Sequence, residues 1–189
     1  MSAAPPLNDP APLAAIAARI TRPVVLVGLM GVGKSTVGRK LASLLQRDFV
    51  DADEAIVEAA QRSIPEIFET FGEAYFRDGE RRVIARLMDE SHGVIATGGG
   101  AFVDPATRAL VLERGIAVWI DCDIDTLVER TARRGNRPLL KNGDPHDILT
   151  RLAQERAPFY GQAHIRVISE TGPHADTARA IIEAIDQWL

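Results

Sequence analysis

Short runs with strand character alternate along the chain with segments in which apolar residues recur every three or four positions. Five runs predict strands, at residues 23–27, 49–53, 94–97, 116–121 and 165–168. The segments between them have the spacing of amphipathic helices. Strands that are separated by helices favour an α/β fold, with a parallel sheet covered by helices on both faces.

The helical segments share an apolar stripe and recognisable ends. Ser63-Ile64-Pro65-Glu66 is a helix start, and a C-terminal helix is expected to bury Ala178, Ile181, Ile182, Ile185 and Leu189. The other predicted helices are 34–46, 73–90, 105–112, one from about 124, and 146–160.

Residues 1–22 have a different character from the rest of the chain. Residues 1–10 are rich in Pro and Ala without periodicity, which predicts disorder, and Pro12 could open a short helix with Leu13, Ile16 and Ile20 on one face. We expect an N-terminal extension over 1–22 and a single domain over 23–189.

A glycine-rich segment joins the first strand to the first long helix. It reads Gly28-Leu29-Met30-Gly31-Val32-Gly33-Lys34-Ser35-Thr36 and fits Gly-x-x-x-x-Gly-Lys-Ser/Thr, the pattern of a phosphate-binding loop. In such a loop backbone N–H groups converge on phosphate oxygens, and the helix N-terminus adds partial positive charge. Lys34 is placed to reach the β- and γ-phosphates, and Ser35 to ligate Mg²⁺. The predicted nucleotide-binding residues are Gly31, Val32, Gly33, Lys34, Ser35 and Thr36.

Composition narrows the range of partners. The chain has 189 residues, 46% hydrophobic and 25% charged, and a net charge of −4, which indicates neither a general nucleic-acid binder nor a membrane-surface binder. The single cysteine, Cys122, excludes an internal disulfide and a cysteine zinc site, and we expect it to be a small buried residue. No apolar run reaches the ~18 residues of a membrane span, and no basic region precedes the Ala-rich N-terminus. We expect a cytoplasmic monomer.

Two further segments follow strands, at the edge where parallel sheets bind ligands. Asp51 and Asp53 end the second strand; their side chains diverge unless the strand stops at 51, and Asp51 could also cap the next helix. Gly98-Gly99-Gly100 follows the third strand. It is either a flexible turn or a place where the backbone approaches a ligand closely, and the neighbouring phosphate loop favours the second interpretation.

Arginines gather at residues 130–137, just before Pro138. The segment is either a solvated helix end or a mobile basic lid over phosphates, and the phosphate loop favours a lid at about 130–142. A GTPase would be expected to show Asn-Lys-x-Asp after a later strand, and none is present. The third strand also lacks the terminal Asp with which many motor ATPases hold Mg²⁺. The pattern therefore favours a small-molecule kinase.

In their order along the chain these motifs resemble those of the shikimate kinases. The resemblance covers about 23–189 and implies a fold like that of nucleoside monophosphate kinases, with strand order 2-3-1-4-5. It implies transfer of the ATP γ-phosphate, with Mg²⁺, to the 3-hydroxyl of shikimate, on the route to chorismate and aromatic amino acids. The motifs that carry it are 28–36, Asp51-Ala52-Asp53, 64–68 with Gly72-Glu73, Phe76-Arg77, 98–100, 137–140 and 156–160.

The resemblance also implies an acceptor site. Arg77 and Arg156 would bind the shikimate carboxylate as guanidinium forks, and Asp53 would accept from the hydroxyls and act as the base. Glu80 would fix the fork of Arg77. The amides of Gly98, Gly99 and Gly100 would approach the ring. Alternatively, Arg77 could be a surface residue paired with Glu80 or Glu73.

On the donor side the resemblance implies that Ser35 and Asp51 hold Mg²⁺ and that Lys34 and Arg137 neutralise the transferring phosphoryl group. Arg130 corresponds to the adenine-stacking position, although the spacing leaves Arg133 open. The turn at 171–173 could also contact the adenine.

Two rival functions are a kinase for another small hydroxy acid, such as gluconate, and a nucleotide-sensing interaction protein. Asp53, Arg77 and Arg156 argue against a sensor, because a sensor needs no anion-binding acceptor site.

Overall fold

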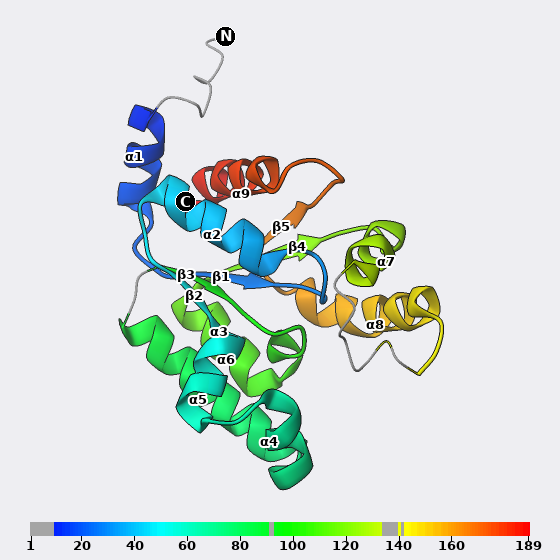
Figure 1. The fold of residues 1–189 in the computed structure, drawn as a ribbon. Coiled ribbons are helices and arrows are strands. Elements are labelled where there is room, and N and C mark those ends of the chain that lie inside the picture. Colours follow the sequence, from blue (N-terminus) through cyan, green and yellow to red (C-terminus); the bar gives the residue numbers. More distant parts are fainter. Residues whose placement is uncertain (1–9, 91–92, 134–139, 141) are drawn as a thin grey trace.

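The core of the protein is one parallel sheet. In the computed structural model, which describes residues 10–90, 93–133, 140 and 142–189, the strands lie in the order β2-β3-β1-β4-β5 (Figure 1). The predicted order 2-3-1-4-5 is therefore confirmed. The strands are β1 (Val24–Val27), β2 (Phe49–Asp51), β3 (Val94–Ala96), β4 (Ile116–Asp121) and β5 (Ile165–Ile168).

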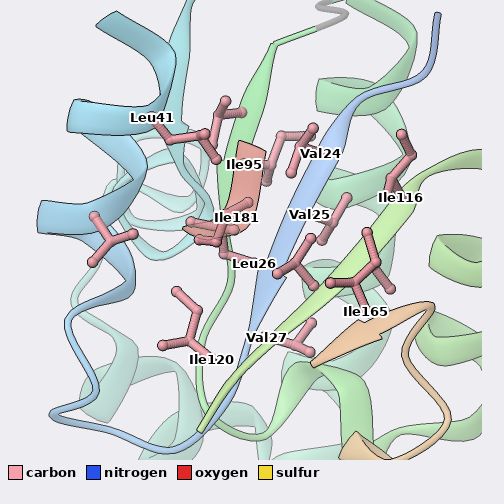
Figure 2. Close-up of a cluster of buried hydrophobic side chains, with 14 of the residues drawn as sticks. Val24, Val25, Leu26, Val27, Leu41, Ile95, Ile116, Ile120, Ile165 and Ile181 are labelled. Atoms are coloured by element: carbon pink, nitrogen blue, oxygen red, sulfur yellow. The ribbon is translucent and has the colours of Figure 1, made fainter. Parts of the chain in front are cut away.

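The central strand β1 is buried along its whole length, because helices cover both faces of the sheet. It pairs in parallel with β3, Val25 opposite Ile95, and with β4, Val25 opposite Ala117. Figure 2 shows its side chains packed among those of neighbouring strands, with Leu41 and Ile181 from helices on one side. The phosphate loop begins at the carboxyl end of this strand. The first residues of the loop are therefore anchored to a buried strand of the core.

The helices form two outer layers. On one face lie α1 (Pro10–Arg19), α2 (Lys34–Leu45) and α9 (His174–Trp188); on the other lie α5 (Glu73–Glu90) and α6 (Pro105–Arg114) (Figure 1). The short helices α3 (Ala52–Ala60) and α4 (Ile64–Phe71) pack on α5 around a second apolar cluster of Ile56, Ile67 and Phe76. The other helical elements are the 3₁₀ turn η1 (Ala101–Val103), α7 (Ile124–Ala132) and α8 (Pro145–Tyr160).

Capping side chains set the starts of most helices. Asp51, Asp104, Asp123 and Asp144 accept backbone N–H bonds at the starts of α3, α6, α7 and α8. Ser63 and Glu66 form a reciprocal capping box at α4, as the sequence start signal predicts.

The N-terminal helix α1 is bound to the domain by apolar and polar contacts. Ile16 and Ile20 are buried in the main core. Arg47 donates hydrogen bonds to the carbonyl oxygens of Ala17 and Ile20, at 2.8 and 2.6 Å, and so satisfies acceptors at the helix C-terminus. The helix expected from Pro12 thus begins at Pro10 and packs on α2.

The structure corrects two of the sequence expectations and confirms a third. The second strand ends at Asp51 rather than 53, because Asp51 caps α3 and Asp53 lies in the first turn of that helix. Leu189 was expected to be buried; it follows the end of α9 and is 44% exposed. Cys122 is buried, as expected for a small apolar residue.

Among the described residues, no helix combines the length and apolarity needed to cross a membrane.

Candidate active site

The phosphate loop has the backbone conformation that its glycines allow. Gly28, Gly31 and Gly33 have φ values of 142°, 86° and 94°, in a region that other residues rarely adopt. Gly33 is the N-cap of α2 and has no side chain with which to cap it, and no acidic residue lies in the first turn. Helices α3, α6, α7 and α8 differ from α2 because an Asp side chain caps each of them. The first N–H groups of α2, in the segment that includes Ser35 and Thr36, are therefore suited to an anion.

The side chain of Lys34 folds over the loop. Its Nζ donates to the carbonyl oxygens of Gly28 and Leu29 at 2.6 and 2.8 Å. These bonds hold the ammonium group at the mouth of the loop. A phosphate bound at the loop would meet this positive charge together with the α2 N-terminus.

Ser35 and Asp51 form a pair of oxygen ligands. The Ser35 hydroxyl donates to Oδ2 of Asp51 at 2.5 Å, while Oδ1 of Asp51 accepts from the backbone N–H of Asp53 at 2.9 Å. Asp51 therefore both caps α3 and reaches the phosphate loop, so the two interpretations of this residue are compatible. A hydroxyl and a carboxylate beside a phosphate site fit the oxygen-ligand preference of Mg²⁺.

Burial and neighbouring charges act on the carboxyl of Asp53. Burial raises the pKa of this carboxyl above the usual range, and the nearby charge of Asp51 raises it further, while Lys34 and Arg77 act in the opposite direction. A raised pKa makes the carboxylate a stronger proton acceptor.

Each glycine of the triple-glycine turn makes room for one of the predicted acceptor side chains. A Cβ atom added to Gly98 would lie 2.9 Å from Oδ1 of Asp53, and one added to Gly99 would lie 3.1 Å from Nη1 of Arg156. A Cβ on Gly100 would collide with the guanidinium of Arg77. The turn is itself held beside β1, because the Thr97 hydroxyl donates to the Leu26 carbonyl at 2.8 Å. The three predicted acceptor residues therefore meet along this turn.

Arg77 is held by a buried carboxylate. Its Nη1 donates to Oε2 of Glu80 at 2.6 Å, and Glu73 lies 3.6 Å from its Nε. Glu80 is 1% exposed; burial raises the pKa of its carboxyl, and Arg77 opposes that rise. The guanidinium lies over the ring of Phe76, which belongs to the apolar cluster between α3, α4 and α5. Its ion pairs thus orient the Arg77 guanidinium.

A cavity of about 850 Å³ opens beside the triple-glycine turn. Of the predicted acceptor residues, Arg77, Gly100 and Arg156 line it, whereas Asp53, Gly98 and Gly99 are not among its lining residues. Phe76 is 4% exposed and belongs to the core rather than to the cavity wall. Two arginines from different helices, α5 and α8, thus face one space large enough for a small carboxylic acid.

A second cavity, of about 270 Å³, adjoins the phosphate loop. Arg130 crosses it, donating to the carbonyl oxygens of Val32 at 3.2 Å and Glu170 at 2.9 Å. Arg133 pairs instead with Glu129 on the surface, which favours Arg130 for the nucleotide position. The lining comprises Gly31, Gly33, Arg130, Arg133, Thr171, Gly172 and His174.

His174 is a site residue that sequence reasoning missed. Its ring lies 3.1 Å from the position of a Cβ on Gly33, so it packs against the phosphate loop. The only sequence signal was its place directly after the turn at 171–173. The predicted catalytic residue Arg137 and most of the predicted lid lie outside the described residues.

Comparison with known proteins identifies the family. The family model described as shikimate kinase matches residues 30–186. A shikimate kinase of Novosphingobium aromaticivorans is 67% identical over 178 residues, covering 92% of each chain, and one of Caulobacter vibrioides is 51% identical, covering 95% of this chain and 87% of the relative. The structure of shikimate kinase from Acinetobacter baumannii in complex with shikimate superposes with a TM-score of 0.83 at 39% identity, covering 90% and 96% of the two chains. The chain belongs to the shikimate kinase family.

Proposed function

We propose that this protein transfers the γ-phosphoryl group of ATP to the 3-hydroxyl of shikimate, forming shikimate 3-phosphate and ADP. The observation that carries the proposal is the triple-glycine turn, along which Asp53, Arg156 and Arg77 meet beside the phosphate loop. An anion-binding fork, a buried carboxylate and a nucleotide loop are the parts that phosphoryl transfer to a small hydroxy acid requires.

The acceptor half provides orientation and a base. Arg77 and Arg156 bind the shikimate carboxylate by charge-assisted hydrogen bonds. Asp53 takes the proton of the 3-hydroxyl as the new O–P bond forms and the bond to the ADP oxygen breaks. Its raised pKa suits this task, because a stronger base accepts the proton more readily.

The donor half neutralises charge. Lys34 lies at the phosphate loop and balances the negative charge on the transferring group, and Arg137 would add to this. Ser35 and Asp51 would hold Mg²⁺. Mg²⁺, when bound, would supply positive charge to the phosphates of ATP.

An ADP-release assay tests the function. Purified protein with ATP, Mg²⁺ and shikimate should produce ADP only when shikimate is present, and gluconate and other small hydroxy acids should give much lower kcat/KM. Shikimate-independent ADP release, or a preference for gluconate, would contradict the proposal. If the protein binds ATP but titration calorimetry detects no shikimate binding, the rival nucleotide-sensing function gains support.

Arg77→Lys should raise the KM for shikimate by roughly 10- to 100-fold, because an ammonium group keeps the charge but loses the two-pronged fork. Lysine is preferred to alanine because Glu80, 1% exposed, would otherwise be left without a cation. Arg82→Lys is the matched control, since Arg82 is on α5 but 77% exposed and paired with Asp78. An unchanged KM in Arg77→Lys would rule out the carboxylate role.

Arg130→Ala should raise the KM for ATP by about tenfold while the KM for shikimate stays within twofold, because the side chain spans the cavity at the phosphate loop. Arg133→Ala should have a smaller effect, since that side chain is 75% exposed and pairs with Glu129. The reverse ranking of the two variants would assign the nucleotide position to Arg133.

We further propose that the enzyme works as a cytoplasmic monomer. Size-exclusion chromatography with light scattering should give a mass near 20.5 kDa. A dimer at micromolar concentration would contradict this.

A further inference from the structure

Tyr160 lies at a junction that the proposed mechanism does not yet use. It is the last residue of α8, is 1% exposed and is among the largest fully buried side chains. Its ring packs against Trp119 of β4, with centroids 5.9 Å apart. A buried tyrosine normally requires a partner for its hydroxyl, so the contacts of that group show what the residue does beyond filling the core.

The Tyr160 hydroxyl and the Arg156 guanidinium meet at the same glycine of the acceptor site. The hydroxyl donates to the carbonyl oxygen of Gly99 at 2.5 Å. Arg156, which precedes Tyr160 by four residues on α8, places its Nη1 3.1 Å from the position of a Cβ on Gly99. Burial raises the pKa of the phenol, with Arg156 and Arg77 opposing the rise. The hydroxyl therefore stays protonated at neutral pH and can donate to Gly99.

Gly99 links the two halves of the site. A Cβ atom added there would lie 3.1 Å from Nη1 of Arg156 and 3.5 Å from the backbone nitrogen of Met30 in the phosphate loop. A group bound to the Gly99 carbonyl therefore acts on a peptide that lies beside both the acceptor arginine and the donor loop. The Tyr160 hydroxyl is that group.

We propose that Tyr160 is a positioning residue that fixes the Arg156 guanidinium and the Gly99 peptide in the geometry that binds the acceptor carboxylate. An arginine side chain has several rotatable bonds, and a second fixed partner reduces the entropy that is lost when the ligand binds. The hydroxyl acts through Arg156, so Tyr160 itself needs no contact with shikimate. This inference rests on the proposed function, because it assumes that Arg156 binds the acceptor.

The test is Tyr160→Phe, which keeps the ring and its contact with Trp119 but removes the hydroxyl. We expect the KM and the calorimetric Kd for shikimate to rise about tenfold, the upper end of the effect of losing one hydrogen bond, while the KM for ATP stays within twofold. Tyr75→Phe is the matched control, since Tyr75 is the other tyrosine of the chain and is 58% exposed. A purely structural role would lower Tm and leave the Kd of the folded protein unchanged; that result would overturn the proposal.

A double-mutant cycle tests the route through Arg156. In an Arg156→Ala background the removal of the Tyr160 hydroxyl should change the shikimate Kd by less than threefold, because the group that it positions is already gone. A full tenfold effect in both backgrounds would show that Tyr160 acts independently of Arg156 and would refute the inference. If Tyr160→Phe does not fold, Gly99→Ala disturbs the same junction from the other side and should also raise the Kd for shikimate; an unchanged Kd would again refute it.

These outcomes separate the inference from the proposed function. Wild-type protein that releases no ADP with shikimate would refute the function. Active wild-type protein whose Tyr160→Phe variant keeps the same KM and Kd would refute only the role of Tyr160.

Discussion

Lys34→Ala is expected to lower kcat by roughly 1000-fold, the size of effect seen when one group that stabilises transition-state charge is removed from an active site. The carbonyl oxygens of Gly28 and Leu29 hold the Lys34 ammonium at the loop, at 2.6 and 2.8 Å, so it is in place before the nucleotide binds. Positive charge that is already in position needs little reorganisation as the phosphoryl group moves.

The matched control is Lys40→Ala, which removes an exposed lysine from the same helix. It should leave kcat within twofold. The Lys34 variant should still bind shikimate with a Kd close to that of the wild type, because the acceptor cavity is lined by residues of α5, α6, α8 and their neighbouring turns. Lys34→Arg should also be impaired, since a planar guanidinium differs in size and shape from an ammonium group. A kcat for Lys34→Ala within tenfold of the wild type would contradict the assigned role.

Local sequence patterns were enough to predict the α/β class of the fold, whereas the strand order came from the resemblance to the shikimate kinases. Four consecutive apolar residues in β1 indicate a strand buried on both faces, and the glycine-rich segment after it has a backbone requirement that few residues meet. Strand β2 was harder, because Asp51 is compatible with a strand end and with a helix cap. The N–H groups of Asp53 and Glu54 that bind its side chain decide the matter, and the strand stops there.

The contacts that assemble the acceptor site are long-range, and the residue pattern does not contain them. The triple glycine predicts a close approach, but the sequence does not say what approaches. In the structure it is Asp53, Arg156 and Arg77, from three different helices. In the sequence Tyr160 was only the last residue of the motif 156–160, with no role of its own. Its hydroxyl acquires a role only when the fold brings Gly99 to it, 61 positions away along the chain.

Asp53→Asn is expected to lower kcat by about 1000-fold, within the range of 10²–10⁴ that a general base contributes, while the KM for ATP changes little. Asparagine has nearly the same shape, so it still fits beside Gly98, but it cannot take a proton from the acceptor hydroxyl. Glu54→Gln is the matched control, since it neutralises the adjacent carboxylate on α3, which is exposed. A wild-type kcat in Asp53→Asn would exclude Asp53 as the base.

The same variant should be more stable than the wild type at neutral pH, and the sign follows from the pKa of Asp53. Because that pKa is raised in the folded protein, ionisation of the carboxyl costs the folded state more free energy than the unfolded chain. The wild type therefore loses stability as the pH rises from the pKa of Asp53 in the unfolded chain to its higher pKa in the folded protein. Asparagine never ionises and avoids this cost, which should raise Tm at pH 7–8 by about 2–4 °C for each kcal/mol recovered. The difference in Tm should shrink as the pH falls toward the ordinary carboxyl range. Lower activity with higher Tm would indicate that Asp53 is held for catalysis at the expense of stability, whereas lower activity with lower Tm would assign it a structural role.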